Sequence, residues 1–204
     1  CAGADSIASA KDDTKQANAN AVEISASKAK IASILVGGWG SNNSLTVKSA
    51  SSLDATYIIL GACSNPPSDL LSTATKSSRG NALVVNGDKT VVNATSIVVG
   101  ADGVSNSMNV EAEANVIATT LSIGTGSTSY SGYGDGNNVL VTGSNSIVKV
   151  ADLYVGKDSS TDAAHIGYAS NNSLTVEDGG LVVMTNDPTL STVNTDKGDQ
   201  NVIR

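Results

Sequence analysis

NSLTVKSASSLDATYIILG, the stretch from Asn43 to Gly61, decides the fold, because further blocks of the chain repeat its pattern. Each block opens on Asn, alternates apolar with polar residues, and closes on Gly eighteen or nineteen residues later. The other full blocks are NALVVNGDKTVVNATSIVVG from Asn81 to Gly100, NSMNVEAEANVIATTLSIG from Asn106 to Gly124, and NNVLVTGSNSIVKVADLYVG from Asn137 to Gly156. A fifth block, NSLTVEDGGLVVM, begins at Asn172 and lacks the ending, and a weaker copy begins at Asn20.

The blocks share three apolar columns. The first column is a pair two residues apart, such as Leu45 and Val47, and the third is another such pair, such as Ile58 and Leu60, directly before the closing Gly. Between them lies a single residue eight positions after the first pair begins: Leu53, Val91, Val116, Ile147 or Val182. A period of two in both pairs indicates strands with one buried face.

A unit of three short strands that cannot bury its inward face alone, repeated along one chain, is typical of a solenoid. We therefore predict an all-β protein, a right-handed parallel β-helix (β-solenoid) of about five to six coils with three short strands per coil. Like residues then stack on like, which predicts a ladder of side-chain amides from the opening Asn residues at one corner. The closing Gly residues are predicted to adopt positive φ.

The stretches between the blocks vary from 5 to 19 residues and fall at one place in the repeat. Insertions at one corner predict variable loops on one side, often the binding side. We expect the β-solenoid domain over residues 20–184, an N-terminal arm or cap over 1–19, and a C-terminal tail or cap over 185–204, where Pro188 interrupts the fifth block. The tail either caps the last coil or continues the sheet of a neighbouring subunit.

Composition favours thin aliphatic stacks. The chain has no Phe, 3% aromatic residues and 20 Gly, so a thick core of large rings is not expected. The net charge of −7 argues against nucleic acid or an anionic membrane surface as the partner. No segment approaches the roughly 18 consecutive apolar residues of a membrane span.

The sequence pattern of the repeats, GxxxSNNSLTV and DGGLVV with VG closing a block, resembles the passenger regions of bacterial autotransporters and related β-helical surface adhesins. The resemblance runs from Asn43 to about Met184. It implies a protein that is extracellular or on the bacterial cell surface, displays loops from a rigid rod, and serves adhesion, surface-layer or fibre roles.

We predict a structural or adhesive surface protein that self-assembles into a filament or surface layer, and not an enzyme. Ile59, Val98 and Tyr154 would form an outward apolar stripe, which is covered either by the chain's own loops or by a neighbouring subunit. Together with Val202 and Ile203 of the tail, these residues are the interface candidates for a homo-oligomer or filament.

The alternative is a carbohydrate-binding or carbohydrate-active β-helix protein, with a glycan or another host-surface ligand as partner. The sugar-stacking candidates are Trp39, Tyr130, Tyr133 and Tyr168, which lie in predicted loops or corners. A carbohydrate-active enzyme needs carboxylates clustered on one strand face, and the outward positions of the blocks are poor in them. We therefore predict no catalytic and no cofactor-binding residues.

The metal and cysteine candidates are few. Asp135, within GYGDGNN, is the candidate ligand for calcium, and no other cofactor is expected. His165, the only histidine, is expected to be an exposed loop residue. Cys1 and Cys63 are either linked as a disulfide or unlinked. Cys1 is also a candidate for lipidation, because Cys-Ala-Gly resembles the mature end of a bacterial lipoprotein, and such a lipid is the one expected link to a membrane.

Overall fold

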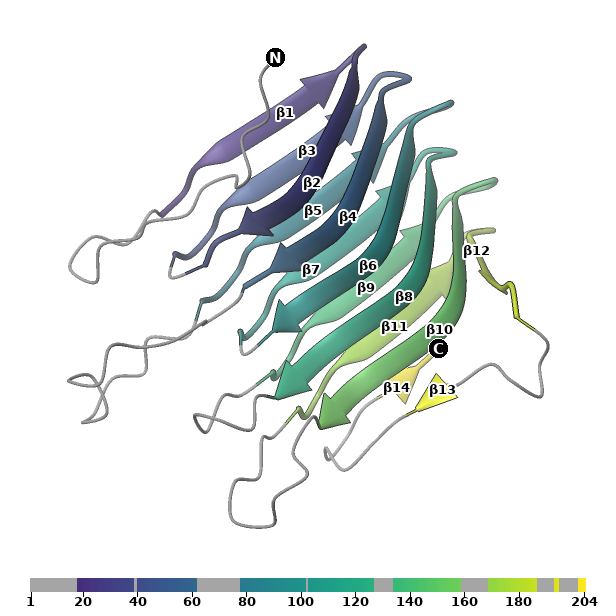
Figure 1. Ribbon diagram of the computed structural model, residues 1–204. Helices are drawn as coiled ribbons and strands as arrows, with labels where there is room; N and C mark the ends of the chain where they lie inside the picture. The colour runs from purple at the N-terminus through teal and green to yellow at the C-terminus, as the bar shows by residue number, and fades with distance from the viewer. Residues whose placement is uncertain are drawn as a thin grey trace.

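The computed structural model describes residues 18–38, 40–61, 78–101, 103–126, 134–158, 169–186, 193–194 and 202–204. These residues are all-β and form two parallel sheets that pack against each other (Figure 1). In the first sheet the strand order is β1-β3-β5-β7-β9-β11-β14, and in the second it is β12-β10-β8-β6-β4-β2 with β13 also beside β10.

The strands of the first sheet are short. They are β1 (Ala21–Ser25), β3 (Ser44–Lys48), β5 (Ala82–Asn86), β7 (Ser107–Glu111), β9 (Asn138–Thr142), β11 (Ser173–Glu177) and β14 (Val202–Ile203). Most strands of the second sheet are about twice as long. They are β2 (Lys28–Val36), β4 (Ser52–Leu60), β6 (Val91–Ala101), β8 (Asn115–Gly126), β10 (Ile147–Asp158), β12 (Leu181–Met184) and β13 (Val193–Asn194).

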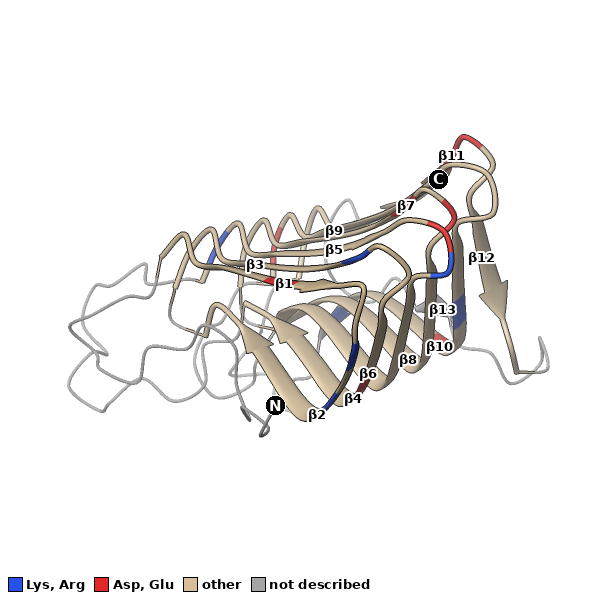
Figure 2. Ribbon diagram, turned by 90° about the horizontal axis from the view of Figure 1, so that it is seen from above, with Lys and Arg blue, Asp and Glu red and all other residues tan. Residues whose placement is uncertain are grey.

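The predicted right-handed parallel β-helix with three short strands per coil is wrong. Each repeat supplies one strand to each sheet, and the architecture is a two-sheet parallel β sandwich. The second and third apolar columns lie on one continuous strand, because the residues between Leu53 and Ile58 pair with β6 instead of forming a turn. Every residue of β4 except Thr56 pairs with a residue of β6, and the long strands bend there without ending (Figure 2).

The middle apolar column is shifted in two repeats. Val91 and Ile147 are half-buried, and the residue after each of them occupies the buried position. The turns before them, opened by Gly87 and Gly143, are one residue longer than the corresponding turns of the neighbouring repeats, which moves the register by one. The observed column is Ala29, Leu53, Val92, Val116, Val148 and Val182.

The core lies between the sheets and runs through all repeats. The inward columns of the first sheet are fully buried from β3 to β9, and they face the equally buried columns that end β4, β6, β8 and β10. Burying one Val or Leu side chain contributes roughly 1.5 to 3 kcal/mol, so the stacked columns supply most of the stabilising burial. The inward residues of the terminal strands are only partly buried: Val22, Ile24, Ala29, Ile31, Val176, Val182 and Met184.

Strands β1 to β12 lie within the predicted central domain, and two strands belong to the predicted tail. β13 pairs with Leu153 and Tyr154 of β10, and β14 pairs with Ser173 and Leu174 of β11. The described part of the tail therefore extends both sheets of its own chain. Along the chain, each variable segment follows a strand of the second sheet and precedes a strand of the first sheet.

Candidate functional site

The most regular polar feature is a ladder of asparagine side chains, one from each repeat. From the second member on, each Oδ1 accepts two hydrogen bonds from the preceding Asn, one from Nδ2 at 2.9–3.1 Å and one from the backbone N–H at 2.9–3.0 Å. The five asparagines that accept these bonds, from Asn43 to Asn172, have no solvent exposure. The predicted amide ladder is confirmed, and its members are Asn20, Asn43, Asn81, Asn106, Asn137 and Asn172.

The closing glycines have a second role that the sequence pattern did not reveal. Their predicted positive φ is confirmed, with values from 66° to 83°. Each of the first four also lies against the ladder residue two repeats further on; a Cβ on Gly124 would stand 2.3 Å from Cγ of Asn172. The opening Asn and the closing Gly therefore form one structural unit, in which the missing Cβ makes room for the amides. The pairs are Gly37 with Asn81, Gly61 with Asn106, Gly100 with Asn137, and Gly124 with Asn172.

The ladder satisfies buried polar groups and offers no reactive atom. From Asn43 to Asn137, each side-chain amide uses its oxygen toward one neighbour and its nitrogen toward the next, which meets the hydrogen-bonding needs of both groups inside the fold. Among the described residues, no group of three or more His, Cys, Asp or Glu side chains could hold a metal ion.

The predicted apolar stripe exists as a row on the outer face of the second sheet. Ile59 pairs with Val98, Val98 with Ser122, and Ser122 with Tyr154, so the four lie on adjacent strands. The three apolar members are half-buried, and Lys157 Nζ lies 3.9 Å from the centroid of the Tyr154 ring. An interface at this row stays a prediction.

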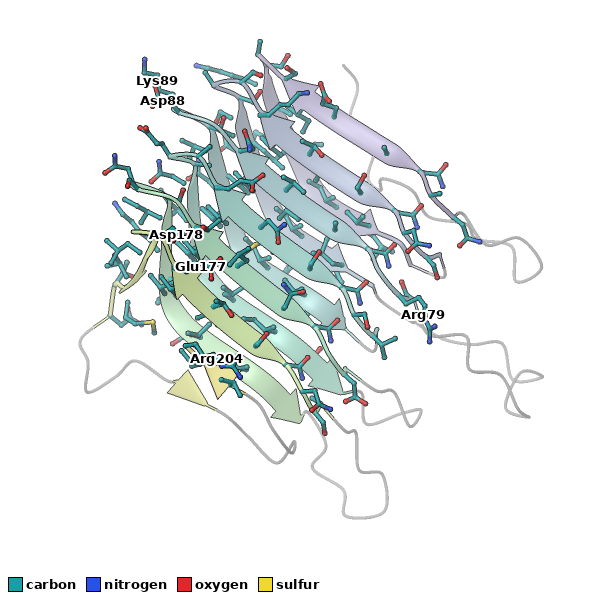
Figure 3. All side chains as sticks on the ribbon, turned by 180° about the vertical axis from the view of Figure 1, so that it is seen from behind. Arg79, Asp88, Lys89, Glu177, Asp178 and Arg204 are labelled. Carbon is teal, nitrogen blue, oxygen red and sulfur yellow. The ribbon has the colours of Figure 1, made fainter. Side chains whose placement is uncertain are left out.

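The tail candidates form the last strand of the first sheet. Val202 N donates to the Asn172 carbonyl at 2.9 Å, and Arg204 N donates to the Leu174 carbonyl at 3.0 Å. Ile203 aligns with Leu174 and is 42% exposed at the open side of the strand. Figure 3 shows Arg204 at this end of the molecule.

The calcium candidate, Asp135, has a structural partner. Its Oδ1 accepts a hydrogen bond from Ser170 N at 2.7 Å, and its carbonyl oxygen accepts one from Ser105 N at 2.9 Å. The residue thus ties together the segments that precede three successive first-sheet strands. Calcium binding at Asp135 stays a prediction.

The other sequence candidates lie outside the described residues. They are Cys1, Trp39, Cys63, Tyr130, Tyr133, His165 and Tyr168. Within the described part of the chain, no helix has the length and apolar character needed to cross a membrane.

A shallow groove on the outer face of the second sheet was not anticipated from the sequence. It has a volume of about 430 Å³ and lies where the long strands bend, lined by outward residues that include Thr95, Thr119 and Ile117. At one end, Asn93 Nδ2 donates to Asp54 Oδ1 at 2.8 Å. The signal that could have located it is the small residue at one repeat position: Ala55, Ala94 and Ala118.

The fold and the ladder define the class of this chain as an all-β protein of two parallel sheets. Comparison with protein-family models, with curated proteins and with solved structures found no match.

Proposed function

We propose that the chain is a structural protein that is extracellular or on the bacterial cell surface. It associates with copies of itself into a filament or layer and serves adhesion. The observation that carries this proposal is the asparagine ladder, buried from Asn43 to Asn172, which joins six successive repeats through the same pair of hydrogen bonds. A uniform stack of this kind suits load-bearing and display, because every repeat is fixed to the next in the same way.

Two further observations support the proposal. The sequence pattern of the repeats is similar to that of autotransporter passengers and surface adhesins, which are extracellular. The variable segments between repeats all leave from strand ends at one corner of the stack, where differences in length leave the paired strands unchanged.

The test is the state of association of the purified chain. Sedimentation velocity over a hundredfold concentration range should show growing assemblies, and negative-stain microscopy should show filaments or layers. A chain that stays monomeric at the highest concentration, and that lacks adhesion to cells or surfaces, overturns the proposal.

The groove on the second sheet favours one alternative, a glycan-binding protein. Hydroxyl, amide and carboxylate groups of Thr95, Thr119, Asn93 and Asp54 line it, and the ring of Tyr57, 50% exposed, lies on the neighbouring outward position of β4. Such a mixture of polar groups and a ring is what a sugar contacts. A glycan array decides: binding that is lost in Asn93→Ala and kept in Asn109→Ala, an outward Asn on the first sheet, supports this alternative.

A further inference from the structure

Asn86, the last residue of β5, and Gly87, the first residue of the following turn, form a chemically reactive pair. In the whole sequence Asn86 is the only Asn that directly precedes Gly. The backbone nitrogen after an Asn can attack the side-chain amide, and Gly allows the closest approach because it has no Cβ. The turn itself requires Gly: φ is +100° at Gly87 and +86° at Gly143, which follows Thr142 in the matching turn.

Ring closure between the two residues releases ammonia. The Gly87 nitrogen loses its proton to water and bonds to Cγ of Asn86, while the bond from Cγ to Nδ2 breaks and Nδ2 takes up a proton to leave as ammonia. Water then opens the cyclic imide at either carbonyl. The products are Asp or isoaspartate, the isomer whose backbone passes through the side-chain carbon. The sum is the hydrolysis of one amide, and it needs no oxidant and no cofactor.

Glu111 on β7 holds both reacting groups while the turn is closed. Its Oε1 accepts a hydrogen bond from Asn86 Nδ2 at 2.9 Å, and its backbone carbonyl accepts one from Gly87 N at 3.2 Å. The first bond has a charged acceptor and fixes the amide that would leave. The second engages the proton that the attacking nitrogen must lose. Because ring closure turns the Gly87 nitrogen toward Cγ of Asn86, this second bond has to break first.

Thr90 restrains the same peptide from the other end of the turn. Its Oγ1 donates to the Asn86 carbonyl at 3.0 Å, and its N donates to the Gly87 carbonyl at 3.1 Å. Asp88 and Lys89, which lie between them, are exposed, and Figure 3 shows both at the outer edge of the molecule. Water therefore reaches this turn, and hydrogen bonds rather than burial keep the amide from reacting.

We propose that Asn86–Gly87 is a modification site that closes to a succinimide, and that β7 shields it while the turn is closed. The reactants are the chain itself and water. When the turn lifts from β7, Asn86 converts to Asp or isoaspartate, and the new carboxylate faces Glu111 on the paired strand. Like charges directly opposite each other are destabilising, so the original contact does not return. The site thus keeps an irreversible record of local opening.

The first experiment measures how far the fold protects Asn86. The chain is incubated at mildly alkaline pH with and without urea, and peptide mass spectrometry follows the replacement of NH₂ by OH at Asn86. We expect conversion to be at least about tenfold slower in the folded chain, because the turn is open for only a small fraction of the time. Both Asp and isoaspartate should appear, since water attacks either carbonyl of the imide.

The second experiment removes the shield. Glu111→Ala takes away the acceptor of Asn86 Nδ2 and should raise the conversion rate of the folded chain about tenfold. Glu111→Gln keeps an oxygen acceptor and should keep most of the protection. Glu113→Ala removes an exposed carboxylate from the next turn and should leave the rate unchanged. Asn43, a buried ladder residue followed by Ser44, is the internal reference, and its amide should stay intact in every folded variant.

The outcomes decide the proposal. Equal conversion of Asn86 in the folded and urea-treated chains overturns it, and so does Asp without isoaspartate, which indicates direct hydrolysis. If Glu111→Ala or Glu111→Gln behaves unlike its expected rate, or if Asn43 converts in parallel with Asn86, shielding by Glu111 is overturned. Selective acceleration at Asn86 in Glu111→Ala alone supports it. These rates do not depend on self-association, so the proposed function stands or falls separately.

Discussion

The two corners of each repeat use hydrogen bonds in different ways. The corner before each first-sheet strand carries Asn in every repeat from Asn20 to Asn172. We call the opposite corner, which precedes the second-sheet strands, the hydroxyl corner. It carries the buried residues Ser51, Thr90, Ala114 and Ser146. One corner is invariant along this chain, and the other tolerates the loss of its polar group.

The difference follows from the number of hydrogen-bonding atoms. An amide has separate donor and acceptor atoms, so it can bond to the repeats on both sides. At the hydroxyl corner, Thr90 Oγ1 donates its one hydrogen to the Asn86 carbonyl of its own turn at 3.0 Å and accepts from Ala50 N at 3.1 Å. This hydroxyl therefore links one neighbour only, and its link is local. A missing amide interrupts the whole row, whereas a missing hydroxyl affects one turn.

The largest expected effect comes from filling the space beside the ladder. Gly124→Ala combines a φ of +71° with a Cβ 2.3 Å from Asn172, and we expect a loss of about 3 to 4 kcal/mol in the free energy of unfolding. Gly87→Ala is the control, because its φ is also positive but the nearest atoms are 3.6 Å away. It should lose about 1 to 2 kcal/mol. Equal losses in urea denaturation would show that the ladder is not packed against the glycine.

Removing one amide tests the ladder directly. Asn106→Ala leaves the buried backbone N–H of Asn81 without its acceptor and removes one donor from Asn137 Oδ1. We expect a loss of about 2 to 3 kcal/mol, because an unsatisfied buried polar group costs roughly 1 to 3 kcal/mol. Asn86→Ala removes a part-buried amide that bonds to Glu111 at 2.9 Å and should cost about 0.5 kcal/mol. Similar losses for the two variants, measured by urea denaturation, contradict a special role for the ladder.

A smaller effect is expected at the hydroxyl corner. Thr90→Val keeps the side-chain shape and removes the acceptor of Ala50 N, with an expected loss of about 1 kcal/mol. Thr46→Val, at an outward half-buried strand position, is the control and should change stability by less than about 0.5 kcal/mol. Thermal unfolding of both variants measures the difference. A loss as large as that of Asn106→Ala would remove the distinction between the two corners.

The smallest effect concerns the position where the hydroxyl is missing. Ala114→Ser would restore a hydroxyl beside the turn of the preceding repeat. We expect a gain of up to about 0.5 kcal/mol in the free energy of unfolding, measured by urea denaturation. Destabilisation by more than about 1 kcal/mol would show that this corner has no room for the group and that Ala114 is required by packing.

The sequence predicted the features that depend on one residue type recurring at a fixed place. The ladder, the positive φ of the closing glycines and the row of Ile59, Val98 and Tyr154 were all accessible in this way. The number of strands per repeat was not. Whether the second and third columns form one strand depends on the residue at the bend, and Thr56 is compatible both with a strand and with a turn.

The remaining errors also have physical causes. The shift at Val91 and Ile147 came from turns one residue longer than their neighbours, which an alignment by spacing cannot place. The contact between Gly124 and Asn172 joins residues two repeats apart, so it depends on the offset between the sheets. The groove depends on small residues where the strands bend, and its lining comes from five successive repeats.

The common direction of the asparagine ladder gives the molecule an electrical polarity. In a sheet the backbone dipoles largely cancel, because successive groups point in alternating directions. The ladder amides do not alternate: each donates toward the next Asn from Asn20 to Asn172, in a row that is buried from Asn43 on and in which hydrogen bonds polarise one another. The row therefore carries partial positive charge toward its Asn172 end and partial negative charge toward Asn20, and lengthening the stack by whole repeats would increase its dipole moment in proportion.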